Sequence, residues 1–227
     1  MNMSSDVTLR LKRLRDHSLS EQIADALIHG LGILLAVFGI LLLLHRATQA
    51  QQSHIIGLLV YAGGMVAMFG ASAAYNIFYA SRFREVLRKA DHAAIFLMIA
   101  GTYTPFILFT YSQPWAILLS LSVWAFCLSG IGLKFINPPL FEKLSLALYL
   151  ALGWCALVLL GPGLWSHAPQ LLLPVALGGA LYTFGVTFHI WETLPYQNAI
   201  WHAFVLAAAA CHYYAVWQGV TQLPALA

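Results

Sequence analysis

The run IADALIHGLGILLAVFGILLLL, residues 23–44, decides the class of fold to which this chain belongs. A helix that crosses a bilayer needs about 20 mainly apolar residues, and this run has that length with polar side chains only near its start. The composition agrees, because 61% of the residues are apolar and only 8% are charged, against about 25% charged residues in soluble domains. The sequence therefore predicts an integral membrane protein.

Six similar runs follow the first, so the sequence predicts seven transmembrane helices. Their expected bounds are Ile23–Leu44, Ile55–Phe78, Ala93–Thr110, Trp115–Leu133, Leu144–Leu160, Leu171–Ile190 and Ile200–Trp217. The connections are short, so neighbouring helices should run antiparallel in one all-α bundle. We expect residues 1–22 to form a cytoplasmic tail, residues 23–217 the single transmembrane domain, and residues 218–227 a short outer tail.

The basic residues predict the direction in which the helices cross the membrane. Ten of the eleven Lys and Arg residues fall in the N-terminal tail, the second predicted loop or the flanks of the fourth, and Arg46 alone falls on the other side. Cytoplasmic loops have an excess of Lys and Arg. The N-terminus is therefore predicted inside the cell and the C-terminus outside.

Polar side chains from five predicted helices converge near the predicted cytoplasmic side. They are Asp25, His29, Ser72, Asn76, Asp91, His92, His189, Asn198 and His202. Polar groups inside a bilayer are costly, and their convergence at one depth predicts a functional site. A plainer interpretation stays open, since acids suit helix N-termini and imidazoles near helix ends can reach water.

Four stretches resemble one known family. They are Glu21–Gly30, Ser72–Asn76, Asp91–Phe106 and Asn198–His212, and the run AGTYTPF within the third is the most specific. The chain resembles the bacterial hemolysin III family, a branch of the progestin and adipoQ receptor superfamily, over all seven spans. The resemblance implies a multi-pass protein of the bacterial cytoplasmic membrane, with membrane lipids as partners and a role in membrane-lipid homeostasis or in cytolysis.

The superfamily resemblance also implies a zinc ion held by three histidines near the cytoplasmic side. Two of those histidine positions are occupied here by Asn76 and Asn198, and only His202 remains. A neutral amide is a much weaker zinc ligand than imidazole. The sequence therefore predicts a degenerate zinc site. No cofactor is expected, and zinc is the one metal whose binding stays open.

At two other positions this chain has the residue that the family resemblance implies, and at a third position it does not. Asp91 corresponds to the aspartate near the zinc ion and Ser72 to the serine of the second-helix motif. Asp91 and His202 are therefore the remaining candidate metal ligands, and either His29 or His92 could add a further ligand. Asp25 stands where the family usually has Asn, and together with His29 and His92 it is predicted to line the polar pocket.

Two functions from different classes follow. The first is non-catalytic, with the pocket binding a lipid or stabilising the bundle; a pore is disfavoured because no span has a polar stripe. The second is a zinc-dependent, ceramidase-like lipid amide hydrolase with Asp91 and Ser72 as catalytic residues, ranked lower because two ligands are missing. A net charge of +3 without a basic cluster argues against nucleic-acid binding, and no protein partner is predicted.

Small residues predict one close helix contact. Gly63, Ala67 and Ala71 follow one another at intervals of four and so share one stripe of the second predicted helix. Small residues at this spacing allow membrane helices to approach closely. We therefore expect this stripe to face a neighbouring helix.

Overall fold

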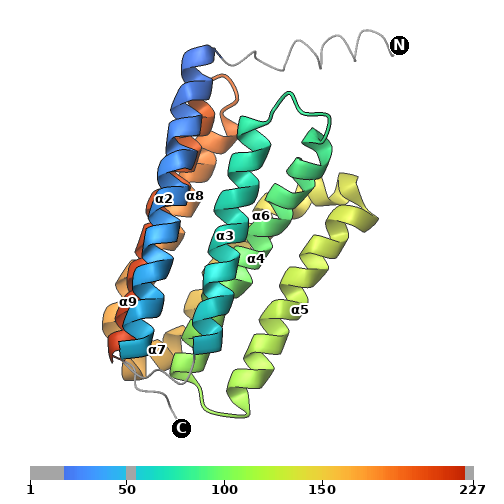
Figure 1. The fold of residues 1–227 in the computed structure, drawn as a ribbon. Helices are drawn as coiled ribbons and strands as arrows, with labels where there is room; N and C mark the ends of the chain where they lie inside the picture. The colour runs from blue at the N-terminus through green and yellow to red at the C-terminus, as the bar shows by residue number, and fades with distance from the viewer. Residues whose placement is uncertain (1–17, 50–54, 223–227) are drawn as a thin grey trace.

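The computed structural model describes residues 18–49 and 55–222, and within these ranges the chain forms helices and no strands (Figure 1). The elements are α2 (Leu19–Gln49), α3 (Ile55–Ile77), α4 (Arg84–Thr110), α5 (Trp115–Ile136), α6 (Pro138–Leu159), α7 (Gly161–His167), the 3-10 helix η1 (Pro169–Leu171), α8 (Leu172–Ile190) and α9 (Gln197–Gln222). Seven helices of the described part are long and apolar enough to cross a membrane. The predicted all-α bundle of seven membrane helices is confirmed.

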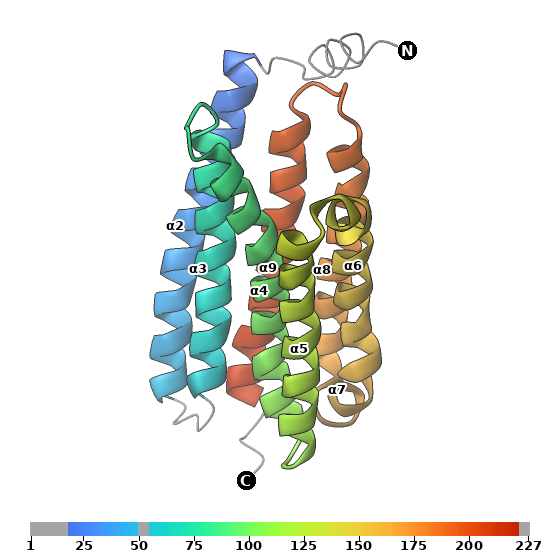
Figure 2. The ribbon, with the colours of Figure 1, turned by 90° about the vertical axis from the view of Figure 1, so that its right-hand side faces the viewer.

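The seven long helices form a closed bundle in which α4 has the most central place. Around the bundle each helix contacts the next in the order α2, α3, α4, α5, α6, α8 and α9, and α9 contacts α2 again. The helix α4 also contacts α6 and α9 across the interior (Figure 2). The first and last long helices are therefore neighbours, although they are farthest apart in the sequence.

Several helices are longer than the apolar runs that predicted them. The helix α4 begins at Arg84 within the predicted loop, and α5 and α6 are separated by Asn137 alone. An apolar run marks only the part of a helix inside hydrocarbon, whereas the hydrogen-bonded backbone continues where long charged side chains can reach water. Asn137 also caps α6, since its side chain accepts a hydrogen bond from the Leu140 amide, and Pro138 suits the first turn.

The tails and one loop also differ from the prediction. The helix α2 includes residues 19–22, and α9 extends to Gln222, beyond the predicted end at Trp217. The remaining parts of the two predicted tails, residues 1–17 and 223–227, lie outside the described residues. The predicted loop between the fifth and sixth spans contains α7 and η1, two short helices that connect α6 to α8.

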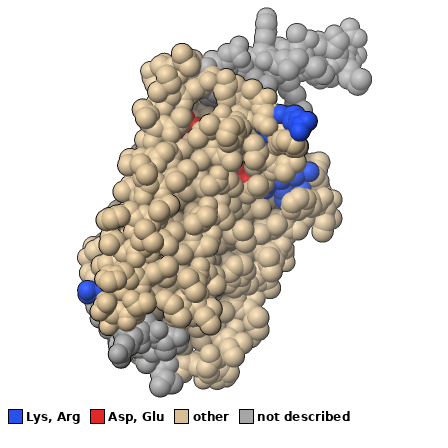
Figure 3. Space-filling model, viewed as in Figure 1, with Lys and Arg blue, Asp and Glu red and all other residues tan. Residues whose placement is uncertain are grey.

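Charged side chains lie near the two ends of the bundle. The face in Figure 3 has Lys and Arg gathered near one end, one basic group near the other, and none between. We call the end where α2 and α4 begin the basic end; its described Lys and Arg residues are Arg82, Arg84, Arg88, Lys89, Lys134 and Lys143. The distribution agrees with the predicted direction of the helices, which itself stays a prediction.

The close contact between α3 and α4 uses a different stripe from the predicted one. Gly63 is exposed, and a Cβ there would meet nothing within 4 Å. A Cβ on Gly64 would instead lie 2.9 Å from the Leu97 carbonyl oxygen, and one on Gly101 would lie 3.2 Å from the Val60 carbonyl oxygen. Glycine spacing alone does not tell two adjacent faces apart; the buried face of α3 is the one on which Gly64 lies with Tyr61 and Met68.

Candidate functional site

Three of the predicted pocket residues meet between α2 and α9 near the basic end. Asp25 and His29 are one turn apart on α2, so they share a face, and His202 lies opposite on α9. His202 Nδ1 donates a hydrogen bond to Asp25 Oδ1 at 2.6 Å, and His29 Nε2 lies 3.5 Å from Asp25 Oδ2. The two imidazole rings are 4.4 Å apart between centroids. The side chains of Asp25, His29 and His202 thus form one compact cluster.

The hydrogen bonding of this cluster is incomplete. Only 4% of the His29 side chain is exposed, and its Nε2 has no hydrogen-bond partner among the described residues. A buried polar atom left without a partner costs about 1–3 kcal/mol. One ligand atom from each of Asp25, His29 and His202 lies within 4.8 Å of the other two. These three side chains are therefore arranged as potential metal ligands.

A second carboxylate on α2 holds the start of α9 in place. Buried Glu21 lies one turn before Asp25, and its Oε1 accepts a hydrogen bond from the Tyr196 amide at 2.8 Å. Its Oε2 accepts from the Ser18 amide at 2.8 Å. Tyr196 immediately precedes α9 and has a φ of 58°. Glu21 thus links the beginnings of α2 and α9, which helps to place His202 opposite Asp25.

A cavity of about 340 Å³ adjoins the cluster and extends into the bundle. His29, Ser72, Asp91 and His202 contribute to its wall near the basic end. Most of the remaining lining is apolar and comes from α3, α4, α6, α8 and α9. Asp91 is close enough to Ser72, His29 and His202 to interact with them electrostatically. The structure therefore brings both predicted catalytic residues to the polar end of one internal cavity.

The two asparagines at the expected histidine positions do not complete a zinc site. Asn76 Nδ2 donates to the Ser72 carbonyl oxygen at 2.9 Å, a bond within its own helix. In the described part of the chain, neither Asn76 nor Asn198 lines the cavity or belongs to the Asp25 cluster. With two amides in place of imidazoles, the residues present do not fit a zinc ion held by three histidines.

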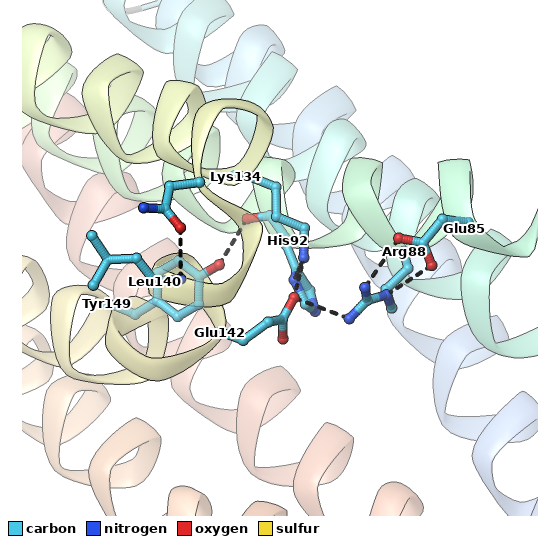
Figure 4. Close-up of polar contacts among 8 residues, drawn as sticks. Glu85, Arg88, His92, Lys134, Leu140, Glu142 and Tyr149 are labelled. Carbon is cyan, nitrogen blue, oxygen red and sulfur yellow. Dashed lines mark hydrogen bonds and ion pairs between the residues drawn. The ribbon is translucent and has the colours of Figure 1, made fainter. Parts of the chain in front are cut away.

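His92 belongs to a different network, which we call the Lys134 network (Figure 4). Lys134 has only 1% of its side chain exposed; its Nζ donates to His92 Nδ1 at 2.9 Å and to Glu142 Oε1 at 2.5 Å. Arg88 Nη1 also donates to Glu142 Oε1, at 3.0 Å. These residues join α4, α5 and α6 at the basic end. The ring of His92 lines the cavity, but its Nδ1 is bonded away from the Asp25 cluster.

Sequence reasoning missed the structural part that Lys134 plays. Its position beside a short loop predicted only a basic residue that sets helix direction, and no local pattern indicated a bond to His92 on another helix. Tyr149 adds a further link between helices, since its hydroxyl donates to the His92 carbonyl oxygen at 3.0 Å (Figure 4). His189 is separate again and packs against Trp201, with ring centroids 5.0 Å apart.

Comparison with known proteins finds relatives over most of the length of this chain. Residues 17–213 match the family described as haemolysin-III related. The chain is 34% identical to Hemolysin-3 of Bacillus cereus over 202 residues, which cover 87% of this chain and 91% of the relative. It is 31% identical to the Hemolysin-3 homolog of Bacillus subtilis over 210 residues, or 92% and 99% of the two chains. It is also 29% identical to the human monocyte to macrophage differentiation factor over 211 residues, or 90% and 86%.

Proposed function

We propose that this chain, which belongs to the haemolysin-III related family, binds a membrane lipid in its internal cavity and acts in membrane-lipid homeostasis without catalysis. The family and the seven apolar helices make it a multi-pass membrane protein, and a location in the cell membrane agrees with its relatives. The observation that supports the proposal is the cavity of about 340 Å³. Small-molecule sites typically measure about 300–1,000 Å³ and are mostly apolar with a few polar groups.

The distribution of side chains around the cavity suits an amphipathic ligand. The polar groups Ser72, Asp91 and His202 lie near the basic end, where a lipid head group would meet hydrogen-bonding partners. The apolar wall farther along, which includes Ile99 and Val205, suits a hydrocarbon chain. A ligand with one polar end and one apolar end therefore matches both parts of the wall.

The helix α6 offers a path between the cavity and the surrounding lipid. Phe141 is its one buried residue within the described chain, so most of α6 faces outward. Residues of both α6 and α8 line the cavity, and a hydrogen bond from Trp154 Nε1 to Thr183 Oγ1, 2.9 Å long, joins these two helices. A lipid that enters from the side between α6 and α8 would have to break this hydrogen bond.

Cytolysis ranks below lipid homeostasis as a role for this chain. Two relatives are named Hemolysin-3 or its homolog. No span, however, shows the polar stripe that would line a water-filled channel. Purified protein added to erythrocytes is expected to leave them intact, and haemoglobin release would reverse the ranking.

Filling the cavity tests the proposed function. Val205 contributes to the cavity wall and packs against the core, so a Val205→Trp side chain should occupy part of the ligand space. The matched control is Val66→Trp, because Val66 is 58% exposed on the outer face of α3. Native mass spectrometry should find lipid retained by the wild type and the control but reduced in Val205→Trp. Equal retention in all three proteins, or none in the wild type, contradicts the proposal.

The same variants connect binding with homeostasis in cells. Deletion of the gene should change the membrane lipid profile, and expression of the wild type or Val66→Trp should restore it. Val205→Trp should fail to restore the profile, since the cavity is filled. An unchanged profile after deletion would separate lipid binding from any role in homeostasis.

A second candidate function is a metal-dependent lipid amide hydrolase. The favouring observation is that Asp91 and Ser72 reach the polar end of a cavity of suitable size. Asp91 would act there as a general base and Ser72 would orient the polar group of the substrate. Purified protein loaded with zinc should then release fatty acid from ceramide, and Asp91→Asn should abolish the release. Absence of release from the wild type leaves the non-catalytic role.

A further inference from the structure

We propose that Asp25, His29 and His202 bind a single divalent metal ion, with Zn²⁺ as the preferred metal. This site differs from the three-histidine arrangement implied by the family resemblance, since two of its ligands come from α2 and one from α9. It shares His202 with the wall of the proposed lipid cavity but is tested separately from the lipid function, because metal binding is measured without added lipid.

The spacing of the donor atoms suits a small metal ion. Bonds of about 2.0–2.2 Å place the ligand atoms of tetrahedral zinc about 3.4 Å apart. Here all three donor atoms lie within 4.8 Å of one another, and the pair His29 Nε2 to Asp25 Oδ2 is already at 3.5 Å. An ion would take the place of the hydrogen bond between His202 Nδ1 and Asp25 Oδ1, whose 2.6 Å separation is shorter than the distance between two zinc ligands. Two imidazoles and one carboxylate are also a donor set found in zinc enzymes.

The buried His29 nitrogen that lacks a hydrogen-bond partner among the described residues is the second observation that points to a ligand. Native proteins leave few buried polar atoms without partners, so each such atom needs an explanation. Among the described residues the other two are the hydroxyl groups of Tyr61 and Thr110. His29 Nε2 differs from both because it lies beside a carboxylate and a second imidazole. A metal ion at this place would give the nitrogen a partner.

The charge of the cluster favours the same conclusion. Asp25 is 7% exposed, and its neighbours in the cluster are imidazoles. Burying a carboxylate is costly unless a cation or several donors balance it. A divalent cation held by Asp25, His29 and His202 would balance this buried charge.

The neighbouring cavity gives the site a place for an exchangeable ligand. His29 and His202 line the cavity wall, whereas Asp25 lies behind them. Three protein ligands leave a fourth position of a tetrahedral ion open, and that position would be filled from the cavity by water or by a polar group of a bound molecule. The mixed nitrogen and oxygen donors favour Zn²⁺ over Mg²⁺ or Ca²⁺, which prefer oxygen ligands.

Metal binding by the full chain in detergent tests the proposal. Protein is stripped with a chelator, loaded with Zn²⁺ alone, desalted and analysed for zinc per chain. We expect about one zinc per wild-type chain. Loss of a partner that only orients a ligand already costs about 10–100-fold in affinity, so loss of a ligand in Asp25→Asn or in His29→Gln should cost about 100-fold or more. The matched control is His189→Gln, because His189 also lines the cavity but packs against Trp201 outside the cluster. It should retain zinc.

Three results would overturn the proposal. The first is a wild-type chain that takes up no zinc after loading. The second is wild-type affinity in both Asp25→Asn and His29→Gln. The third is loss of zinc in Asn76→Ala and Asn198→Ala but not in Asp25→Asn, which would place the ion at the family's positions. Metal-free thermal unfolding checks that each variant is folded.

A measurement on the wild type alone keeps the test independent of the variants. Co²⁺ replaces Zn²⁺ in sites of this kind and absorbs visible light according to its coordination. A spectrum of tetrahedral Co²⁺ with nitrogen and oxygen ligands supports the site, and a spectrum of hydrated octahedral Co²⁺ alone overturns it.

Discussion

Two polar clusters lie near the basic end of the bundle, and they differ in how completely their groups are paired. In the Lys134 network, Lys134 and Arg88 share the carboxylate of Glu142, and His92 accepts from Lys134. In the Asp25 cluster, the buried His29 Nε2 lies 3.5 Å from Asp25 Oδ2 but has no hydrogen-bond partner among the described residues. A fully paired network stabilises the packing of helices, whereas an incomplete one next to a cavity is suited to binding a ligand.

The largest expected effect comes from breaking the Lys134 network. Glu142→Ala removes the carboxylate and leaves the buried ammonium of Lys134 without its counter-charge, which should lower the free energy of unfolding by about 3 kcal/mol. Thermal unfolding in detergent measures the loss. The control is Glu85→Ala, because Glu85 is 63% exposed and also pairs with Arg88; a loss below about 1 kcal/mol is expected there. Equal losses would show that the burial of Lys134 has no consequence.

The next effect is stabilisation by zinc, which should depend on the Asp25 cluster only. At a free concentration 100 times the dissociation constant, a ligand that binds the folded state adds about 2.7 kcal/mol to its stability. Wild type and Glu142→Ala should both show the corresponding rise in unfolding temperature, and Asp25→Asn should show none. A zinc-dependent rise in Asp25→Asn would mean that the metal binds elsewhere.

A smaller effect is expected where one hydroxyl links two helices in the Lys134 network. Tyr149→Phe removes the hydrogen bond to the His92 carbonyl oxygen and should cost about 1 kcal/mol. The control is Tyr214→Phe, whose hydroxyl accepts a bond from Gln218 on an exposed face, and whose loss should be near zero. Zinc affinity should be the same in both variants. A change of zinc affinity in Tyr149→Phe would mean that the two clusters are coupled.

Sequence reasoning predicted the depth of the Asp25 cluster but not its membership. Asp25, His29 and His202 all come from predicted helix ends on one side, so their shared depth follows from helix direction. That α2 and α9 are neighbours depends on how the bundle closes, and Asp25 and His202 are 177 positions apart. The sequence predicts Asp91 and His202 as the remaining metal ligands, which stays a prediction; the structure adds that Asp25 and His29 group with His202. Identical residue types at one depth do not reveal which helices touch.

The same limit applies to the Lys134 network and to the helix contacts. Apolar runs predicted all seven spans because hydrocarbon thickness determines their length. They did not predict that α5 and α6 meet at Asn137, which brings Lys134 within reach of Glu142. The choice of Gly64 over Gly63 likewise depends on the neighbouring helix. Contacts between helices are determined by packing, which one sequence describes only indirectly.

The smallest change in stability is expected for His29→Leu, and this variant distinguishes the Asp25 cluster from the Lys134 network most clearly. His29→Leu removes the buried nitrogen that lacks a hydrogen bond and puts an apolar side chain of similar size in its place, so the metal-free protein should be as stable as the wild type or slightly more stable. Thermal unfolding in a chelator measures this, and unfolding with added zinc should then favour the wild type. The difference in stability between His29→Leu and the wild type should therefore change sign when zinc is added. Glu142→Ala, by contrast, should be less stable than the wild type both with and without zinc. A loss above about 2 kcal/mol in chelator would mean that His29 stabilises the bundle by itself, as Glu142 does.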